Sequence, residues 1–106
     1  MSFGVSYSQK ARNDHAVGLC QKTAASIIQW TGSLINQVNS NTADDKLTEM
    51  DAHNIAVTIF YDVQLEDAMR ELGMQENQDL ILAVNRLKSL QKLYLFEQKG
   101  GENYLG

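Results

Sequence analysis

Several features that would point to a function are missing from this sequence of 106 residues. Cysteine occurs once, at Cys20, so no internal disulfide can form and the four-ligand cysteine zinc sites are excluded. No apolar run approaches the roughly 20 residues that cross a bilayer, and Met1 to Val17 has no apolar signal-peptide core. We therefore expect no membrane insertion and a cytoplasmic, reducing location.

Catalytic motifs are also missing. The chain has no glycine-rich phosphate loop, no paired histidines and no serine elbow. His15 and Cys20 are five positions apart, which places them on different faces of a helix, so they cannot act together on one substrate or metal. We expect no enzyme activity, no cofactor and no metal site.

Positive charge is scarce. Nine lysines and arginines stand against 13 acidic residues, and the net charge of -4 argues against a protein that coats nucleic acid non-specifically. Between Asn41 and Gly73 there are eight acidic residues against two basic ones. The C-terminal part has no such excess of acidic residues, so we expect an anionic partner to bind there.

What the chain does contain is enough apolar residue, 43%, to fill the core of one domain spanning residues 1–106. We expect residues 1–10 to be a flexible start and residues 11–40 to form a long amphipathic helix, because apolar residues recur there at spacings of three and four. The stripe is longer than the C-terminal unit described below can cover, which predicts an oligomer interface, most simply a homodimer. Its predicted interface residues are Val17, Ile27, Leu34 and Val38.

The middle of the chain is ambiguous. Thr48 with Asp51 is a capping signal, and a helix from Met50 would turn Ile55, Ile59 and Phe60 inward, with Val57 and Tyr61 on the adjoining face. The run from Ile55 to Val63 is also β-branched and apolar, so a strand competes with the helix over these residues.

The C-terminal part has clearer signals. Gln64 to Leu72 has the apolar spacing of a short helix, Gly73 supplies a left-handed stop, and Asn77 caps a new helix. After Leu93 the residues alternate as in a strand, and a double glycine can turn a β-hairpin over 93–105. The inward stripe of the second helix is Leu80, Ala83, Val84, Leu87 and Leu90.

Two helices followed by a hairpin are the parts of a winged helix, here residues 48–106. We therefore predict a mainly α (α+β) fold, with a long N-terminal helix, a winged helix-turn-helix and a C-terminal β-hairpin. The alternative is an all-α three-helix bundle in which Asp79 to Glu97 is simply the third helix.

The stretch DVQLEDAMRELGMQENQDLILAVNRLKSLQKLYLFEQKGGENYL resembles the winged-helix superfamily in the order of its elements and the spacing of its apolar residues. Within that group, DLILAVNRLKSL followed by GGENYL is similar to helix-and-wing segments of ESCRT-II subunits. The resemblance covers about 44 of the 106 residues. It implies a module that joins proteins, since winged helices in those subunits do not read DNA.

The sequence thus predicts a binding module that acts as an adaptor or assembly subunit in a protein complex. The alternative is a small dimeric DNA-binding transcriptional regulator, in which helix 79–91 enters a groove of duplex DNA and the wing at 93–105 contacts phosphate. In both cases the partner-binding residues would be Asn85, Arg86, Ser89, Lys92 and Lys99.

Overall fold

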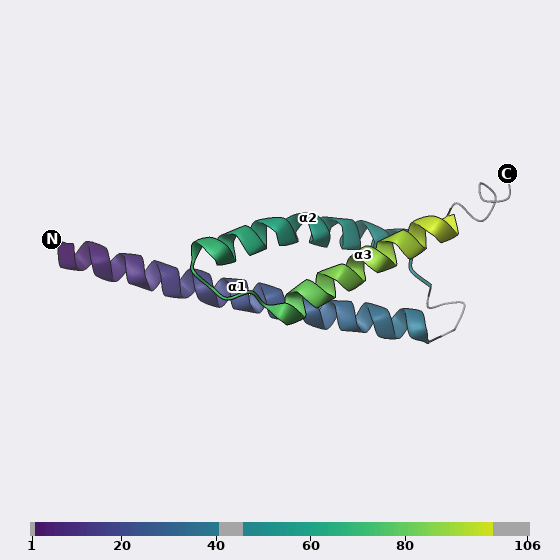
Figure 1. The fold of residues 1–106 in the computed structure, drawn as a ribbon, viewed down its shortest axis with the longest axis horizontal. Helices are drawn as coiled ribbons and strands as arrows, with labels where there is room; N and C mark the ends of the chain where they lie inside the picture. Colours follow the sequence, from purple (N-terminus) through teal and green to yellow (C-terminus); the bar gives the residue numbers. More distant parts are fainter. Residues whose placement is uncertain (1, 41–45, 99–106) are drawn as a thin grey trace.

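The computed structural model is a bundle of three helices, α1 (Ser2–Asn39), α2 (Glu49–Glu71) and α3 (Gln78–Gln98). It describes the backbone of residues 2–40 and 46–98, and within these ranges the side chains from residue 9 onward. There is no strand in the described ranges. The winged-helix prediction is therefore wrong, and the three-helix alternative is the fold that the chain adopts (Figure 1).

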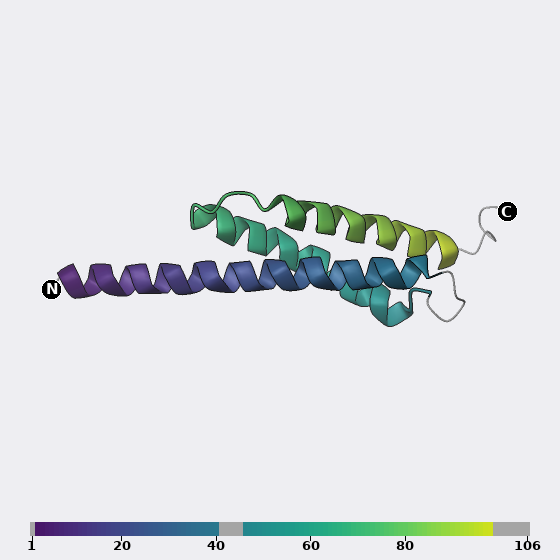
Figure 2. The ribbon, with the colours of Figure 1, turned by 90° about the horizontal axis from the view of Figure 1, so that it is seen from below.

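The helices run up, down and up. α2 returns along α1, and α3 turns back beside both of them (Figures 1 and 2). α1 is much the longest helix, about 57 Å at 1.5 Å per residue, and its first turns project past the turn between α2 and α3. This projection makes the molecule a rod of 70 × 27 × 22 Å.

The wing is absent because α3 continues to Gln98. Residues 93–98, expected as the first strand, are its last turns. The half-buried Tyr94 lies four residues after the buried Leu90 and seven after Leu87, so the inward stripe of α3 runs on through a segment that resembled a strand. The remainder of the expected hairpin, residues 99–105, lies outside the described residues.

α2 resolves the ambiguity in the middle of the chain. Ile55 to Val63 is helical throughout and continues without a break into the segment that was expected to be a separate helix. Ile55 is fully buried and Ile59 half-buried, so packing at a spacing of four overrides the strand preference of these β-branched residues. Phe60, expected to point inward, is exposed.

The helix ends follow the sequence signals. At the start of α2, Thr48 and Asp51 form a reciprocal capping box with two hydrogen bonds of 3.0 Å. At its end Gly73 has φ 72°, and the amides of Gly73 and Met74 donate to the carbonyls of Arg70 and Met69.

The side chain of Asn77 accepts a hydrogen bond of 3.1 Å from the Leu80 amide, as predicted for the cap of α3. The short connection from Gly73 to Asn77 therefore has a defined hydrogen-bonded residue at each end, and it sets α3 antiparallel to α2 (Figure 1).

The core consists of two apolar clusters. The turn-end cluster lies beside the α2–α3 turn and consists of Cys20, Ala24, Met69, Leu80 and Val84. The loop-end cluster lies toward the other end of the bundle and consists of Leu34, Ile55, Leu87 and Leu90. Every helix contributes to both clusters, so each helix is held at two levels along the bundle.

Two polar residues are buried at positions between the clusters, Thr31 on α1 and Asp62 on α2. The hydroxyl of Thr31 donates to the carbonyl of Ile27 at 2.7 Å and so has a partner. The Oδ1 atom of Asp62 has none among the described residues, although the residue is only 3% exposed. Such an atom is costly to bury, which marks Asp62 as the weak point of the core.

Candidate protein-binding surface

The predicted partner-binding residues lie along one exposed side of α3. Asn85, Arg86, Ser89 and Lys92 are all exposed, at spacings that keep them together on the helix. The Ser89 hydroxyl donates to the Asn85 carbonyl of the same helix at 3.2 Å. Lys99, the fifth predicted residue, lies outside the described residues.

Arg86 also borders a shallow hollow between α1 and α3, with a volume of about 280 Å³. Gly32 contributes to this hollow from α1, and a Cβ added at this glycine would meet nothing within 4 Å. The hollow also contains Asp79, so its charge is mixed and does not favour an anionic ligand.

The residues predicted to form an oligomer interface on α1 are occupied within the chain. Leu34 belongs to the loop-end cluster, and Ile27 and Val38 are half-buried against it. Val17, also half-buried, borders a hollow beside Met69 of α2. Because α2 and α3 cover this stripe, it does not require a second copy of the chain.

A different apolar surface is left open, on the side of α2 that faces away from the bundle. Its members are each at least a third exposed, and we call them the outer face of α2: Met50, Val57, Phe60 and Tyr61. Met50, Val57 and Tyr61 follow one another at spacings of seven and four residues along about three helical turns, and Phe60 adjoins Tyr61. Met50 is 66% exposed, Phe60 64% and Tyr61 58%.

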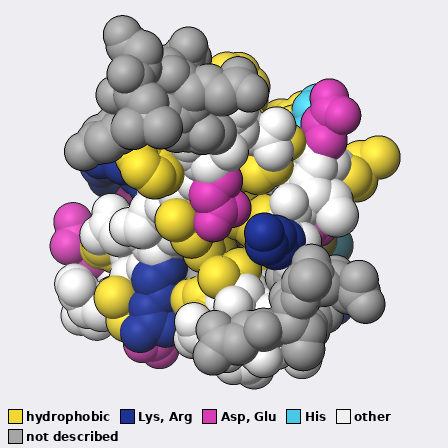
Figure 3. Space-filling model, turned by 90° about the vertical axis from the view of Figure 1, so that its right-hand side faces the viewer, with side chains coloured by type: hydrophobic (Ala, Val, Ile, Leu, Met, Phe, Trp, Pro, Cys, Tyr) yellow, Lys and Arg dark blue, Asp and Glu magenta, His cyan; other side chains and the backbone are white. Residues whose placement is uncertain are grey.

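The two aromatic rings of the outer face are already in contact. The ring centroids of Phe60 and Tyr61 are 5.6 Å apart with an angle of 76° between the planes, an edge-to-face arrangement. Seen from the end where α2 begins, hydrophobic side chains reach the surface among isolated charged ones (Figure 3). Clusters of exposed apolar side chains mark interaction sites on globular proteins, which makes the Phe60–Tyr61 pair a candidate.

Sequence reasoning missed this surface because it assigned one apolar face to α2. The helix has two, an inner stripe of Ile55, Asp62 and Met69 and an outer stripe of Met50, Val57 and Tyr61. A signal was present, since Met50, Val57 and Tyr61 keep heptad-like spacing on the side opposite Ile55.

The charges around the outer face are mostly acidic. α2 contains six acidic residues and one arginine. That arginine, Arg70, is paired with Asp67 at 2.8 Å, and both side chains are largely exposed. Glu49 and Glu71 are exposed at the two ends of the helix. The outer face is thus an apolar strip with a carboxylate at either end.

Asp62 is the one ionisable group of the described core whose pKa is strongly shifted. Burial raises the pKa of this carboxyl from 3.8 to about 7, and the hydrogen bond and negative charge of Glu66, one turn further along α2, raise it as well. Lys88 on α3 lowers it.

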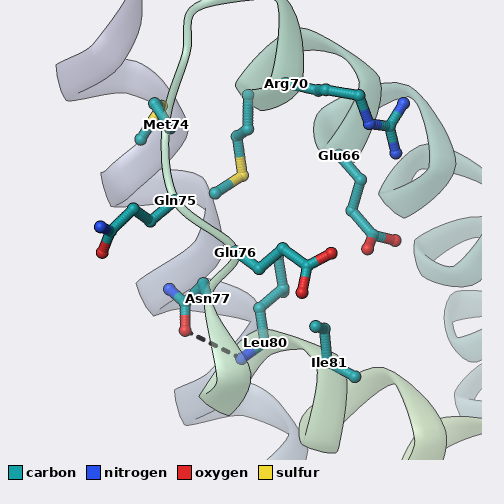
Figure 4. Close-up of a pocket in the computed structure, with 9 residues that line it drawn as sticks. Glu66, Arg70, Met74, Gln75, Glu76, Asn77, Leu80 and Ile81 are labelled. Carbon is teal, nitrogen blue, oxygen red and sulfur yellow. Dashed lines mark hydrogen bonds between the residues drawn. The ribbon is translucent and has the colours of Figure 1, made fainter.

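A small hollow lies at the turn between α2 and α3 and measures only about 130 Å³ (Figure 4). Sites for small molecules usually have at least about 300 Å³. Glu66 of α2 and Glu76 of the turn border it, while the Arg70 guanidinium extends away from it. The hollow is therefore too small for a substrate.

The described part of the chain offers neither a metal site nor a membrane span. Residues 2–40 and 46–98 contain no group of three histidine, cysteine, aspartate or glutamate side chains placed to hold a metal ion. None of the three described helices combines the length and apolar character needed to cross a membrane.

Comparison with known proteins assigns the chain to no family. A scan against models of protein families, a search of curated proteins and a search of solved structures find no match to it.

Proposed function

We propose that this protein is a helical binding module that acts as an adaptor or assembly subunit in a protein complex, and that the outer face of α2 is its binding surface. One observation carries the proposal: α2 is apolar on two opposite sides, and the bundle covers only one of them. A helix that is apolar all round is normally buried on all sides.

The composition of the outer face supports this role. Aromatic and methionine side chains are enriched at the centres of protein interfaces, where a few of them supply most of the binding energy. Phe60 and Tyr61 already hold each other in one arrangement, so less side-chain freedom is lost when a partner covers them.

The alternative of a dimeric DNA-binding regulator is not proposed. It depended on a wing beside α3, and the residues expected to begin the wing are helical. The exposed cations of α3 are Arg86, Lys88 and Lys92, beside Asn85 and Ser89.

The experiment is site-specific photocrosslinking in the native cell. A photoreactive amino acid at Val57, on the outer face, should give a crosslinked product of defined mass, and the same group at Ser89, on the exposed side of α3, should not. The crosslinked protein is then identified and purified, and its affinity for the unmodified chain is measured.

Phe60→Ala should weaken that affinity about 30-fold, because removing a central aromatic side chain from an interface costs about 2 kcal/mol or more. Leu95→Ala is the matched control, since Leu95 is a comparably exposed apolar residue on α3. Equal crosslinking at Val57 and Ser89, or equal binding by the Phe60→Ala variant, would contradict the proposal.

A further inference from the structure

The charges around the outer face of α2 identify the kind of partner that it fits. Resting on the function proposed above, we infer that the occupant is a basic amphipathic helix of another protein, and not a second copy of this chain. The inference depends on the placement of Glu49 and Glu71 relative to Phe60.

The three residues are evenly spaced along α2. Glu49 lies eleven residues before Phe60, and Glu71 lies eleven residues after it. Eleven residues make close to three helical turns, so both carboxylates lie in nearly the same line as the Phe60 ring, each about 16 Å from it. Both glutamates are exposed, and no ion pair joins either of them to a described residue.

This placement disfavours pairing between two copies centred on Phe60. In an antiparallel pair of α2 helices centred on Phe60, Glu49 of each copy would meet Glu71 of the other. In a parallel pair, each glutamate would meet its own counterpart. Both arrangements place carboxylates together at both ends of the contact, which opposes association.

The shape of the surface selects a helix as the occupant. The outer face is a strip on one convex helix, about 17 Å from Met50 to Tyr61. Two helices pack by fitting rows of side chains into the grooves between them, and a strip of three turns matches that geometry. A peptide that binds by strand addition would need a sheet edge, and the described ranges contain no strand.

The occupant is thus expected to have an apolar stripe of three turns with a lysine or arginine near each end. Its cations would meet Glu49 and Glu71, while its apolar side chains would cover Phe60 and Tyr61. An anionic lipid surface is disfavoured by the same two carboxylates.

The test uses two labelled synthetic peptides of about 18 residues, long enough to form a helix on binding. Both carry the same leucine stripe, and the outward positions are lysine in one peptide and glutamate in the other. Binding to the full-length protein is followed by fluorescence anisotropy. The lysine peptide should bind at least tenfold more tightly than the glutamate peptide, and its affinity should fall between about 50 mM and about 300 mM salt.

Variants separate this surface from general attraction to an acidic protein. The double variant Glu49→Gln/Glu71→Gln should weaken the lysine peptide several-fold, and Phe60→Ala at least tenfold. The matched charge control is Glu76→Gln/Glu97→Gln, which removes two exposed carboxylates away from the outer face and should leave binding within a factor of two.

Several results would overturn the inference. These are equal binding of the two peptides, no binding of either, equal effects of the two double variants, or a dimer in sedimentation that Phe60→Ala dissolves. Photocrosslinking tests the proposed function separately. If the partner captured at Val57 presents an acidic or non-helical segment, the proposed function is supported and the inference of a basic helix is wrong.

Discussion

α2 and α3 are of similar length and pack on the same long helix, yet they contribute differently to the core. The five buried residues of α3 are all apolar, and they occupy one side. α2 buries only Ile55, Asp62 and Met69, one of which is an acid. Both helices also leave large apolar side chains exposed, among them Phe60 on α2 and Leu82 on α3.

The two helices therefore have different structural roles within one small domain. α3 serves the core and contributes two residues to each apolar cluster. α2 gives one residue to each cluster and presents a second apolar side to the solvent. The sequence of α2 therefore reflects both the buried inner stripe and the exposed outer face.

The largest expected effects test whether the inner side of α2 is docked as firmly as α3. Ile55→Ala on α2 and Leu87→Ala on α3 both remove a fully buried side chain of the loop-end cluster, so each should lower the free energy of unfolding by about 2–5 kcal/mol. Urea denaturation followed by circular dichroism measures both values.

Phe60→Ala is the control on the outer side of α2 and should change the free energy of unfolding by less than about 0.5 kcal/mol. A loss below about 1 kcal/mol for Ile55→Ala alone would show that α2 is not packed on the core as described.

The buried Asp62 of α2 should make the free energy of unfolding depend on pH. Because its pKa is raised from 3.8 to about 7 in the folded chain, the folded state keeps a proton that the unfolded state has lost. The free energy of unfolding should therefore fall as pH rises from about 4 to about 7, and level off above that.

Asp62→Asn should remove most of this slope and stabilise the chain at pH 8 by an amount on the order of 2–4 kcal/mol. The measurement is urea denaturation at a series of pH values, with Asp67→Asn, an exposed acid of the same helix, as the control. An unchanged slope in Asp62→Asn would place the titrating group elsewhere.

Two glycine substitutions should have the smallest effects on stability, one in the turn between α2 and α3 and one inside α1. Gly73 has φ 72°, where a Cβ is strained, so Gly73→Ala should cost about 1–2 kcal/mol. Gly32 lies inside α1 with open space where a Cβ would stand, so Gly32→Ala should stabilise by about 0.5–1 kcal/mol. Thermal unfolding of the two variants should shift in opposite directions, and a shift in the same direction would contradict the assigned turn.

The local signals of the sequence predicted the ends of the helices correctly. The capping box at Thr48, the left-handed Gly73 and the Asn77 cap each depend on a few neighbouring residues, and all three are present in the structure. The inward stripe of α3 was also predicted in full, because its buried apolar residues recur at spacings of three and four.

Predictions that depended on distant contacts were wrong. The LYLF segment has the composition of a strand, but Tyr94 continues a stripe that α1 and α2 already cover, so it stays helical. Phe60 was assigned to the core because nothing local distinguishes the inner apolar side of α2 from the outer one. Which side is covered is decided by where α1 and α3 pack.

The projecting start of α1 should open more easily than the part of the same helix that packs in the core. Residues 9–15 are exposed all round, whereas Cys20 and Ala24 belong to the core. A helical segment of this length is marginal in water by itself, so its turns can open one after another without disturbing the bundle. Amide protons along a single hydrogen-bonded ladder would then exchange over a gradient of lifetimes, from fast near Gln9 to the rate of global unfolding beyond Cys20.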